Sequence, residues 1–256
     1  MMWLIAALVG VYAVWRFFRT LNGLPVLMFH KVDPELQDTL TVSVPQLERQ
    51  LQWLQKHNYQ TITLEQLTDS LQHQKPLPDR SVLITFDDAY VNNLTYALPI
   101  LQRFGMKAVL FVPTAFIGRC NEWDGCTEPL MTTDQLWQLL PTFELALHSH
   151  QHLNYKHQTA TDIQADLTDN ITTFDALHLP YVRAFAYPYG GRPKDATIKQ
   201  AMQNTMQQLG IRLAFRIGNR LNRFPLNNHY ELKRLDIRGT DSMAQFARKI
   251  RFGKLI

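Results

Sequence analysis

The chain of 256 residues is long enough for one large domain or two small ones, and its core needs no disulfide or metal staples. With 46% hydrophobic and 19% charged residues, the composition is that of a globular protein and excludes disordered chains and coiled coils. The formal net charge of +4 comes without a long Lys/Arg run, which argues against a nucleic-acid-binding protein. Two cysteines, Cys120 and Cys126, are too few for a cysteine-rich zinc module, so a metal site would need His and carboxylate ligands.

The amino-terminal segment is the one membrane-like stretch of the sequence. Residues 1–15 carry no charged side chain, and the apolar character continues around Arg16 until Arg19 ends it. Residues 1–18 as a helix would span about 27 Å, slightly less than the roughly 30 Å hydrocarbon core. A signal peptide and a buried helix are the alternatives, but the segment has no clear basic region or small-residue cleavage site. We expect residues 1–19 to form an uncleaved, single-pass membrane anchor.

Short apolar runs alternate with amphipathic segments along the rest of the chain, without a linker or an internal repeat. This pattern predicts one domain over residues 24–256. The runs are nearly continuous rather than alternating, which is typical of parallel strands covered on both faces. The predicted strands lie at residues 25–29, 81–86, 107–112, 143–147, 182–187 and 212–217.

Segments of helical periodicity separate these strands. Two of them begin with the spacing of a capping box, at Ser43 and at Thr63, and continue with leucines at helical spacing. Further helical patterns lie at about residues 91–104, 133–140, 161–177 and 195–208. The repeated βα unit predicts an α/β fold, either an open doubly wound sheet or a βα barrel.

Polar residues at the ends of four strands favour the barrel. The residues and the turn in question are His30, Asp87, Asp88, His148 and the Pro-Tyr-Gly turn at 188–190. In a βα barrel the carboxyl ends of all strands meet on one face, whereas an open sheet gathers ligands mainly at its switch point.

Asp87 and Asp88 are adjacent carboxylates at the end of a predicted strand. Where a strand gives way to a loop, both side chains can reach one cavity. The alternative is that Asp88 caps a helix beginning near Tyr90 while Asp87 is solvated, since Asp is a common N-cap residue. The pair alone does not decide between a catalytic role and a capping role.

Four of the nine histidines fall between His148 and His157. His148 and His152 are four residues apart, so on a helical turn their rings would share one face and reach one metal ion, while His150 would point away. A solvated His-rich loop is the alternative. Together with one carboxylate from another strand, the two histidines would form a set with open coordination positions, as in catalytic zinc or ferrous sites.

These motifs resemble those of the polysaccharide deacetylases, which are family 4 carbohydrate esterases with a NodB homology domain. TFDDAY at residues 85–90 is similar to the first motif of the family, and His148-Ser149-x-x-His152 is similar to its His-Ser/Thr-x-x-His motif. The third motif is commonly Arg-x-Pro-Tyr-Gly, but in this chain Ala186 stands in place of the arginine. The segments LPVLMFHKV and FAYPYGG resemble the poly-N-acetylglucosamine deacetylase branch.

The resemblance spans residues 24–250 and implies a distorted, NodB-type (β/α) barrel of about seven parallel strands. The transmembrane helix expected from the apolar segment at 1–19 would precede it. It also implies one divalent metal ion, for which we expect Zn²⁺, with Co²⁺, Ni²⁺ or Fe²⁺ as alternatives. The residues that match the metal ligands are Asp88, His148 and His152. Asp87 would be the general base that activates water, and His30 the general acid that protonates the leaving amine. The backbone N–H of Tyr189 would stabilise the oxyanion.

For His30, the alternative is a core histidine bonded to the backbone. The missing arginine leaves open which group orients Asp87, and Arg234 and Asp236 in LKRLDIRG are candidates for supporting it.

Three aromatic and proline side chains are candidates for substrate contacts. Trp123, with Asp124 beside it, lies between the first two motifs and would line a sugar-binding groove, although an exposed loop aromatic is as often mere cover. Tyr187 and Pro188 belong to the third motif and are further candidates.

The sequence therefore predicts a hydrolase that removes N-acetyl groups from N-acetylglucosamine units of a polysaccharide similar to poly-N-acetylglucosamine and releases acetate. The alternatives are a deacetylase of peptidoglycan or chitin oligomers, an O-acetyl esterase, and an inactive polysaccharide-binding barrel, which the missing arginine would favour. The expected partners are an acetylated polysaccharide and a membrane, without nucleic acid.

Two arguments conflict about the side of the membrane on which the domain lies. Arg16 and Arg19 follow the apolar segment, so the positive-inside rule would leave the domain in the cytoplasm. Relatives that act on exported or wall polymers favour the outside, and Cys120 and Cys126 could form a disulfide only in an oxidising compartment. We expect a cell-membrane protein with an extracytoplasmic domain.

Overall fold

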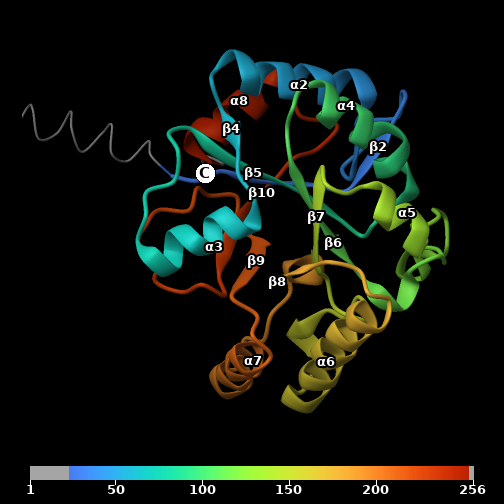
Figure 1. Ribbon diagram of the computed structural model, residues 1–256, viewed down its shortest axis with the longest axis vertical. Helices are drawn as coiled ribbons and strands as arrows, with labels where there is room; N and C mark the ends of the chain where they lie inside the picture. The colour runs from blue at the N-terminus through green and yellow to red at the C-terminus, as the bar shows by residue number, and fades with distance from the viewer. Residues whose placement is uncertain (1–22, 254–256) are drawn as a thin grey trace, which may run out of the picture.

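The computed structural model describes residues 23–253, so the predicted anchor at 1–19 lies outside the described residues. Seven parallel strands form a closed barrel in the order β1-β10-β9-β8-β7-β6-β5, and β5 pairs with β1 to complete the ring (Figure 1). These strands are β1 (Val26–Phe29), β5 (Ser81–Asp87), β6 (Ala108–Val112), β7 (Phe143–Leu147), β8 (Val182–Ala186), β9 (Leu213–Ile217) and β10 (Leu232–Asp236). The prediction of an α/β barrel is confirmed.

The remaining short strands lie outside the ring. The strand β4 (Gln60–Thr61) pairs with β5, and β2 (Lys31–Asp33) pairs with β3 (Thr41–Ser43) in a separate two-stranded sheet. The barrel is irregular between β7 and β8, where the register shifts at Ala146 and Leu147.

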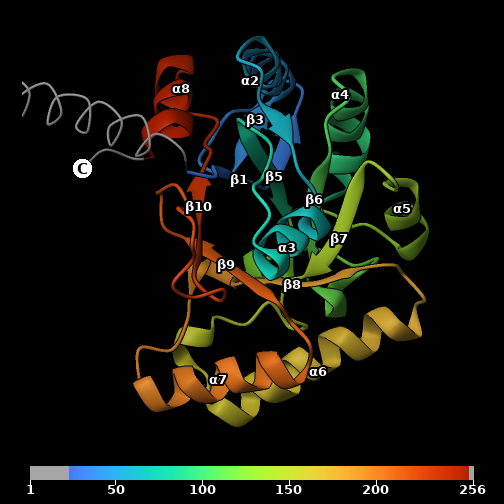
Figure 2. The same ribbon diagram turned by 60° about the vertical axis from the view of Figure 1, so that its left-hand side comes forward.

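The helices surround the barrel, and α6 and α7 run side by side along one flank, as Figure 2 shows. They are α2 (Val44–Lys56), α3 (Leu64–His73), α4 (Leu98–Arg103), α5 (Thr133–Gln138), α6 (Ala160–Ala176), α7 (Ala196–Gln208) and α8 (Met243–Phe252). Each predicted helical pattern has its helix, but the segment predicted at 91–104 begins with a π-helical turn at Asn93–Ala97 before α4. The apolar runs and helical patterns of the sequence did not predict β10 or α8. No helix within residues 23–253 is both long and apolar enough to cross a bilayer.

The barrel strands are apolar on both faces because each face meets a different part of the core. Val26, Phe111 and Phe215 belong to the cluster that fills the barrel. Phe29 and Phe86 alternate with inward-facing residues and belong to the cluster beneath the surrounding helices. Two covered faces explain why these strands read as continuous apolar runs.

The two ends of the barrel differ in chemistry. Leu64 and Leu67 on α3 belong to the cluster that fills the barrel, and the Glu144 carboxylate on β7 accepts a hydrogen bond of 2.6 Å from the backbone N–H of Leu64. At the carboxyl ends of the strands the interior instead becomes polar. Asp87 ends β5, His148 follows β7, and Arg234 lies on β10. The fold therefore collects charged side chains at one rim of the barrel.

Candidate metal centre and active site

Asp88, His148 and His152 converge at this rim, and one candidate ligand atom from each lies within 4.8 Å of the other two. Asp88 Oδ1 lies 3.2 Å from His148 Nε2 and 3.1 Å from His152 Nε2. This oxygen is buried, yet it makes no hydrogen bond to the described residues. A tetrahedral zinc ion with bonds of roughly 2.0–2.1 Å holds its ligand atoms about 3.3 Å apart. The donor types and their separations therefore fit a divalent metal ion.

Hydrogen bonds on the far side of each imidazole orient the two rings. His148 Nδ1 lies 2.8 Å from the carbonyl oxygen of Ala186, which can only accept, so Nδ1 carries a proton and Nε2 is the nitrogen that faces Asp88. His152 Nδ1 lies 3.2 Å from the Tyr189 hydroxyl. Outer partners of this kind fix the orientation of metal-binding histidines.

The two histidines meet without the helical turn that their spacing suggested. Residues 148–152 form no helix, and the backbone is left-handed at Ser149 (φ 68°) and at His152 (φ 53°). Asp88 is also left-handed, with φ 74°, and its side chain faces the histidines rather than capping a helix. The expectation of a helical turn is wrong, because a bent loop brings the rings together instead.

Asp87 is held by a buried arginine from another strand. Arg234 on β10 donates from Nη1 to Asp87 Oδ1 at 2.6 Å and from Nη2 to Oδ2 at 2.8 Å. Only 1% of the Arg234 side chain is exposed, and its guanidinium group lies over the Phe111 ring. Arg234 is therefore the group that orients Asp87. The third motif commonly has an arginine at its first position, where this chain has Ala186.

The charges around the two aspartates keep both carboxylates ionised. Burial alone would raise the pKa of Asp87, but the positive charge of Arg234, with smaller contributions from His148 and His30, lowers it below the usual value. Burial opposes ionisation of Asp88 as well, yet His152 and His148 hold the pKa of Asp88 well below the usual value. Asp87 is therefore ionised at neutral pH and able to accept a proton.

His30 lies beside Asp87, as the sequence predicted for a residue that follows β1. Its Nε2 is 3.8 Å from Asp87 Oδ2, and His148 Nε2 is 3.9 Å from the same oxygen. The His30 side chain is partly exposed, at 15%, so its ring borders the site and solvent instead of being enclosed in the core.

Two aromatic side chains enclose His152. Trp123 stacks on its ring with a centroid distance of 4.0 Å and an interplanar angle of 24°, and Tyr189 meets it edge-on at 4.8 Å. Trp123 lies in a loop that the Cys120–Cys126 disulfide closes. His152 thus covers one face of the Trp123 ring, so only the rest of the ring could contact a sugar. Tyr189 has a left-handed backbone (φ 57°) and is 56% exposed beside the site.

Tyr187 and Pro188 do not line the site, so their prediction as substrate contacts is wrong. Ala186 ends β8 and belongs to the cluster inside the barrel, whereas Tyr187, the next residue, belongs to the cluster beneath the surrounding helices. Tyr187 is fully buried there, packs against Phe185, and donates a hydrogen bond of 3.1 Å to the carbonyl oxygen of Tyr230. Pro188 is also buried.

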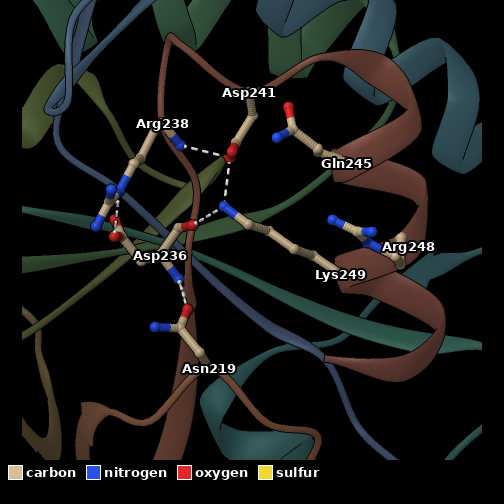
Figure 3. Close-up of a pocket in the computed structure, with 7 residues that line it drawn as sticks. All are labelled: Asn219, Asp236, Arg238, Asp241, Gln245, Arg248 and Lys249. Atoms are coloured by element: carbon tan, nitrogen blue, oxygen red, sulfur yellow. Dashed lines mark hydrogen bonds and ion pairs between the residues drawn. The ribbon is translucent and has the colours of Figure 1, made fainter. Parts of the chain in front are cut away.

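Asp236 does not support Asp87. Its carboxylate accepts a hydrogen bond of 2.7 Å from Arg238 Nε, and both residues line a separate cavity of about 200 Å³ between β10 and α8 (Figure 3). The other lining residues are Asn219, Asp241, Gln245, Arg248 and Lys249. Of the two residues predicted to support Asp87, only Arg234 contacts it.

A closed parallel barrel with an Asp-His-His cluster and an ionised carboxylate at the carboxyl ends of its strands is typical of barrel hydrolases. Comparison with known families agrees with this class. Residues 74–214 match the polysaccharide deacetylase family. The chain belongs to that family, as its sequence motifs predicted.

Two curated relatives are similar over most of the chain. YxkH of Bacillus subtilis (strain 168), whose name places it among polysaccharide deacetylases, is 29% identical over 189 residues, which are 73% of this chain and 63% of that protein. The poly-beta-1,6-N-acetyl-D-glucosamine N-deacetylase of Staphylococcus epidermidis is 28% identical over 177 residues, which are 65% of this chain and 60% of that protein. The matched regions thus span less than two thirds of either relative.

Solved structures share the fold. The deacetylase PplD of Streptococcus pyogenes superposes with a TM-score of 0.75 at 19% identity, over 89% of this chain and 98% of that chain. IcaB from Ammonifex degensii also gives a TM-score of 0.75, at 22% identity, over 90% of this chain and 97% of that chain. At these identities the likeness concerns the fold alone.

The ion pair between Asp87 and Arg234 gives a stability prediction. R234M would leave the Asp87 carboxylate buried without its partner, so we expect the free energy of unfolding to fall by about 3 kcal/mol. The double variant R234M/D87N should be more stable than R234M, because a neutral amide removes the unpaired charge. Urea denaturation followed by circular dichroism measures both.

R238M is the matched control for this experiment, because it breaks an arginine–aspartate pair in which Arg238 is exposed. We expect it to lower the free energy of unfolding by less than about 1 kcal/mol. If R234M were as stable as R238M, the Asp87–Arg234 pair would contribute no more to the free energy of unfolding than an exposed ion pair does.

Proposed function

We propose that the protein is a metal-dependent polysaccharide N-deacetylase that hydrolyses acetamido groups on N-acetylglucosamine units and leaves free amines and acetate. The observation that carries the proposal is the ion-paired Asp87 carboxylate beside the Asp88–His148–His152 cluster. The name of the Staphylococcus epidermidis relative supports a β-1,6-linked poly-N-acetylglucosamine as the polymer.

Asp88, His148 and His152 would hold the metal ion, because a carboxylate and two imidazoles suit a catalytic divalent site with open positions. Zn²⁺ fits this donor set best, with Co²⁺, Ni²⁺ and Fe²⁺ as alternatives. The bound ion would supply a Lewis acid that polarises the amide carbonyl and acidifies water.

Asp87 would accept the proton of the attacking water. Arg234 fixes the carboxylate in one orientation and favours its ionised form, so it is ready to act as a base at neutral pH. The backbone N–H of Tyr189 would help to stabilise the negative charge that develops on the carbonyl oxygen.

His30 would protonate the departing amine. An amine is a poor leaving group unless it receives a proton as the carbon–nitrogen bond breaks, and an imidazole can supply one near neutral pH. His30 suits this role because it is partly exposed at the rim and within 4 Å of Asp87 Oδ2.

The position of Arg234 also bears on the alternative of an inactive polysaccharide-binding barrel. That alternative drew its support from the missing third-motif arginine, which would leave the base unoriented. Because Arg234 makes two short hydrogen bonds to Asp87, the absence no longer argues against catalysis.

Variants of the four central residues test the division of roles. D88A, H148A and H152A should each lose bound metal and acetate release together, because each removes a ligand. D87N should keep the metal and lose turnover by about 10²-fold or more, because only the base is removed. Metal content by mass spectrometry and acetate release from acetylated poly-N-acetylglucosamine and from chitin oligomers measure these effects.

D79N is the matched control, since Asp79 is an exposed carboxylate just before β5, at the opposite end of that strand from Asp87, and it should behave like the wild type. Full activity of D87N would refute the assignment of the base. If D87N lost the metal as the three ligand variants do, Asp87 could not be assigned a role as base that is separate from metal binding.

H30A tests the general acid. It should keep the metal and lose amide hydrolysis far more than hydrolysis of an activated acetyl ester, whose leaving group needs little protonation. The ratio of kcat/KM for the two substrates, compared between H30A and the wild type, measures the effect. Equal losses on amide and ester would assign His30 a structural role.

We also propose that residues 1–19 anchor the protein in the cell membrane with the domain outside the cytoplasm. The disulfide between Cys120 and Cys126 supports this side, because such bonds persist in oxidising compartments. In intact cells a membrane-impermeant thiol reagent should label the protein only after reduction, and a C120S/C126S variant should stay unlabelled. Cysteines that are protected in intact cells, yet react after lysis without reductant, would place the domain in the cytoplasm.

A further inference from the structure

The loop between the two candidate metal-binding histidines is held by a carboxylate that none of the sequence motifs contains. Asp166 on α6 is 4% exposed. Its Oδ1 accepts a hydrogen bond of 2.8 Å from the backbone N–H of Gln151, and its Oδ2 accepts one of 3.1 Å from the backbone N–H of His150. The Tyr155 hydroxyl donates to the same Oδ2 at 2.6 Å. Three donors from the loop region thus converge on one buried carboxylate.

A second group of contacts, one helical turn further along α6, holds His150 itself. Asn170 donates from Nδ2 to Thr114 Oγ1 at 2.8 Å, and Thr114 Oγ1 lies 2.9 Å from His150 Nδ1. The backbone N–H of Ala115 donates to the His150 carbonyl oxygen at 3.0 Å. His150 therefore faces α6 and the segment after β6, away from the candidate metal centre, and anchors the loop there.

The loop needs such restraint because its backbone is strained on both sides of these contacts. Ser149 and His152 are left-handed, a conformation that costs non-glycine residues of order 1 kcal/mol or more and persists where the surroundings impose it. The Ser149 hydroxyl accepts a hydrogen bond of 2.9 Å from the Leu153 N–H within the loop. The bonds to Asp166 act on the two residues that lie between the strained positions.

We propose that Asp166 is a positioning residue for the metal centre: by holding the backbone of His150 and Gln151, it sets the His148 and His152 imidazoles at their separation from Asp88 before a metal ion binds. The inference rests on the proposed metal centre and deepens it. A carboxylate suits the position better than an amide, because it offers two acceptor oxygens to three donors. Burial and the charge of Asp166 raise the pKa of Tyr155 well above its usual value, so its hydroxyl keeps the proton that it donates.

The test compares Zn²⁺ affinity in D166N with that in a matched control on the same helix. D166N keeps the size of the side chain but turns an NH₂ group toward a backbone N–H or the Tyr155 hydroxyl. D169N alters an exposed aspartate three residues further along α6. Competition with a chelator on the metal-free, full-length protein gives the dissociation constants, and the visible absorption of the Co²⁺-loaded protein reports ligand geometry.

We expect D166N to bind Zn²⁺ about 10- to 100-fold more weakly than the wild type and to show an altered Co²⁺ spectrum, while D169N matches the wild type. A D166N protein with a lower melting temperature but unchanged affinity and spectrum would make Asp166 merely structural and overturn the proposal. Y155F removes only one of the three donors, and we expect a smaller loss of affinity in the same direction.

If D166N fails to fold, Y155F decides, and unchanged Zn²⁺ affinity in that variant overturns the proposal. A wild-type protein that binds no Zn²⁺ would instead refute the metal centre, and the positioning role with it. The two failures are therefore distinguishable.

Discussion

The buried ion pair between Asp87 and Arg234 lies where the barrel closes, and it also fixes a carboxylate of the polar rim. The two residues are 147 positions apart in the chain and lie on β5 and β10, which flank β1 in the closed sheet. A charge inside a barrel is costly unless a partner and hydrogen bonds satisfy it, so each residue depends on the other. Leu27 on β1 pairs with Leu235 on β10 and with Ile84 on β5, so Arg234 lies nearer the amino ends of the strands than Asp87 does, and its long side chain reaches along the barrel to the carboxylate. Asp87 in turn lies within 4 Å of His30 and His148.

Alternation along the strands decides which side chains can take part in this site. Residues that face inward become the polar rim at the carboxyl ends, and their neighbours in sequence pack beneath the helices. Ala186 and Tyr187 illustrate the difference. The carbonyl oxygen of Ala186 orients His148, whereas the larger Tyr187 faces outward and contributes to the core. A motif read as one unit is thus divided between the candidate metal centre and the packed core.

The candidate metal ligands are held from several directions by contacts within the protein. The disulfide-closed loop places Trp123 on one face of His152, and Tyr189 lies against the edge of the same ring. Asp166 fixes the backbone between the two histidines. Such support limits the rearrangement needed on binding, which is the usual basis of tight and geometrically selective metal sites.

The sequence by itself determined the continuous strands, most of the helices and the residues of the Asp-His-His cluster, because strand burial, capping boxes and short motifs are local properties. Only the tertiary structure decided that Arg234, and not Asp236, holds Asp87, since the contact joins two strands that are far apart in the sequence, and no local pattern shows that both lie beside β1. It also replaced the expected helical turn between His148 and His152 with a loop that has left-handed residues, in which the backbone N–H groups of His150 and Gln151 donate to the Asp166 carboxylate on α6 instead of to carbonyl oxygens of a helix.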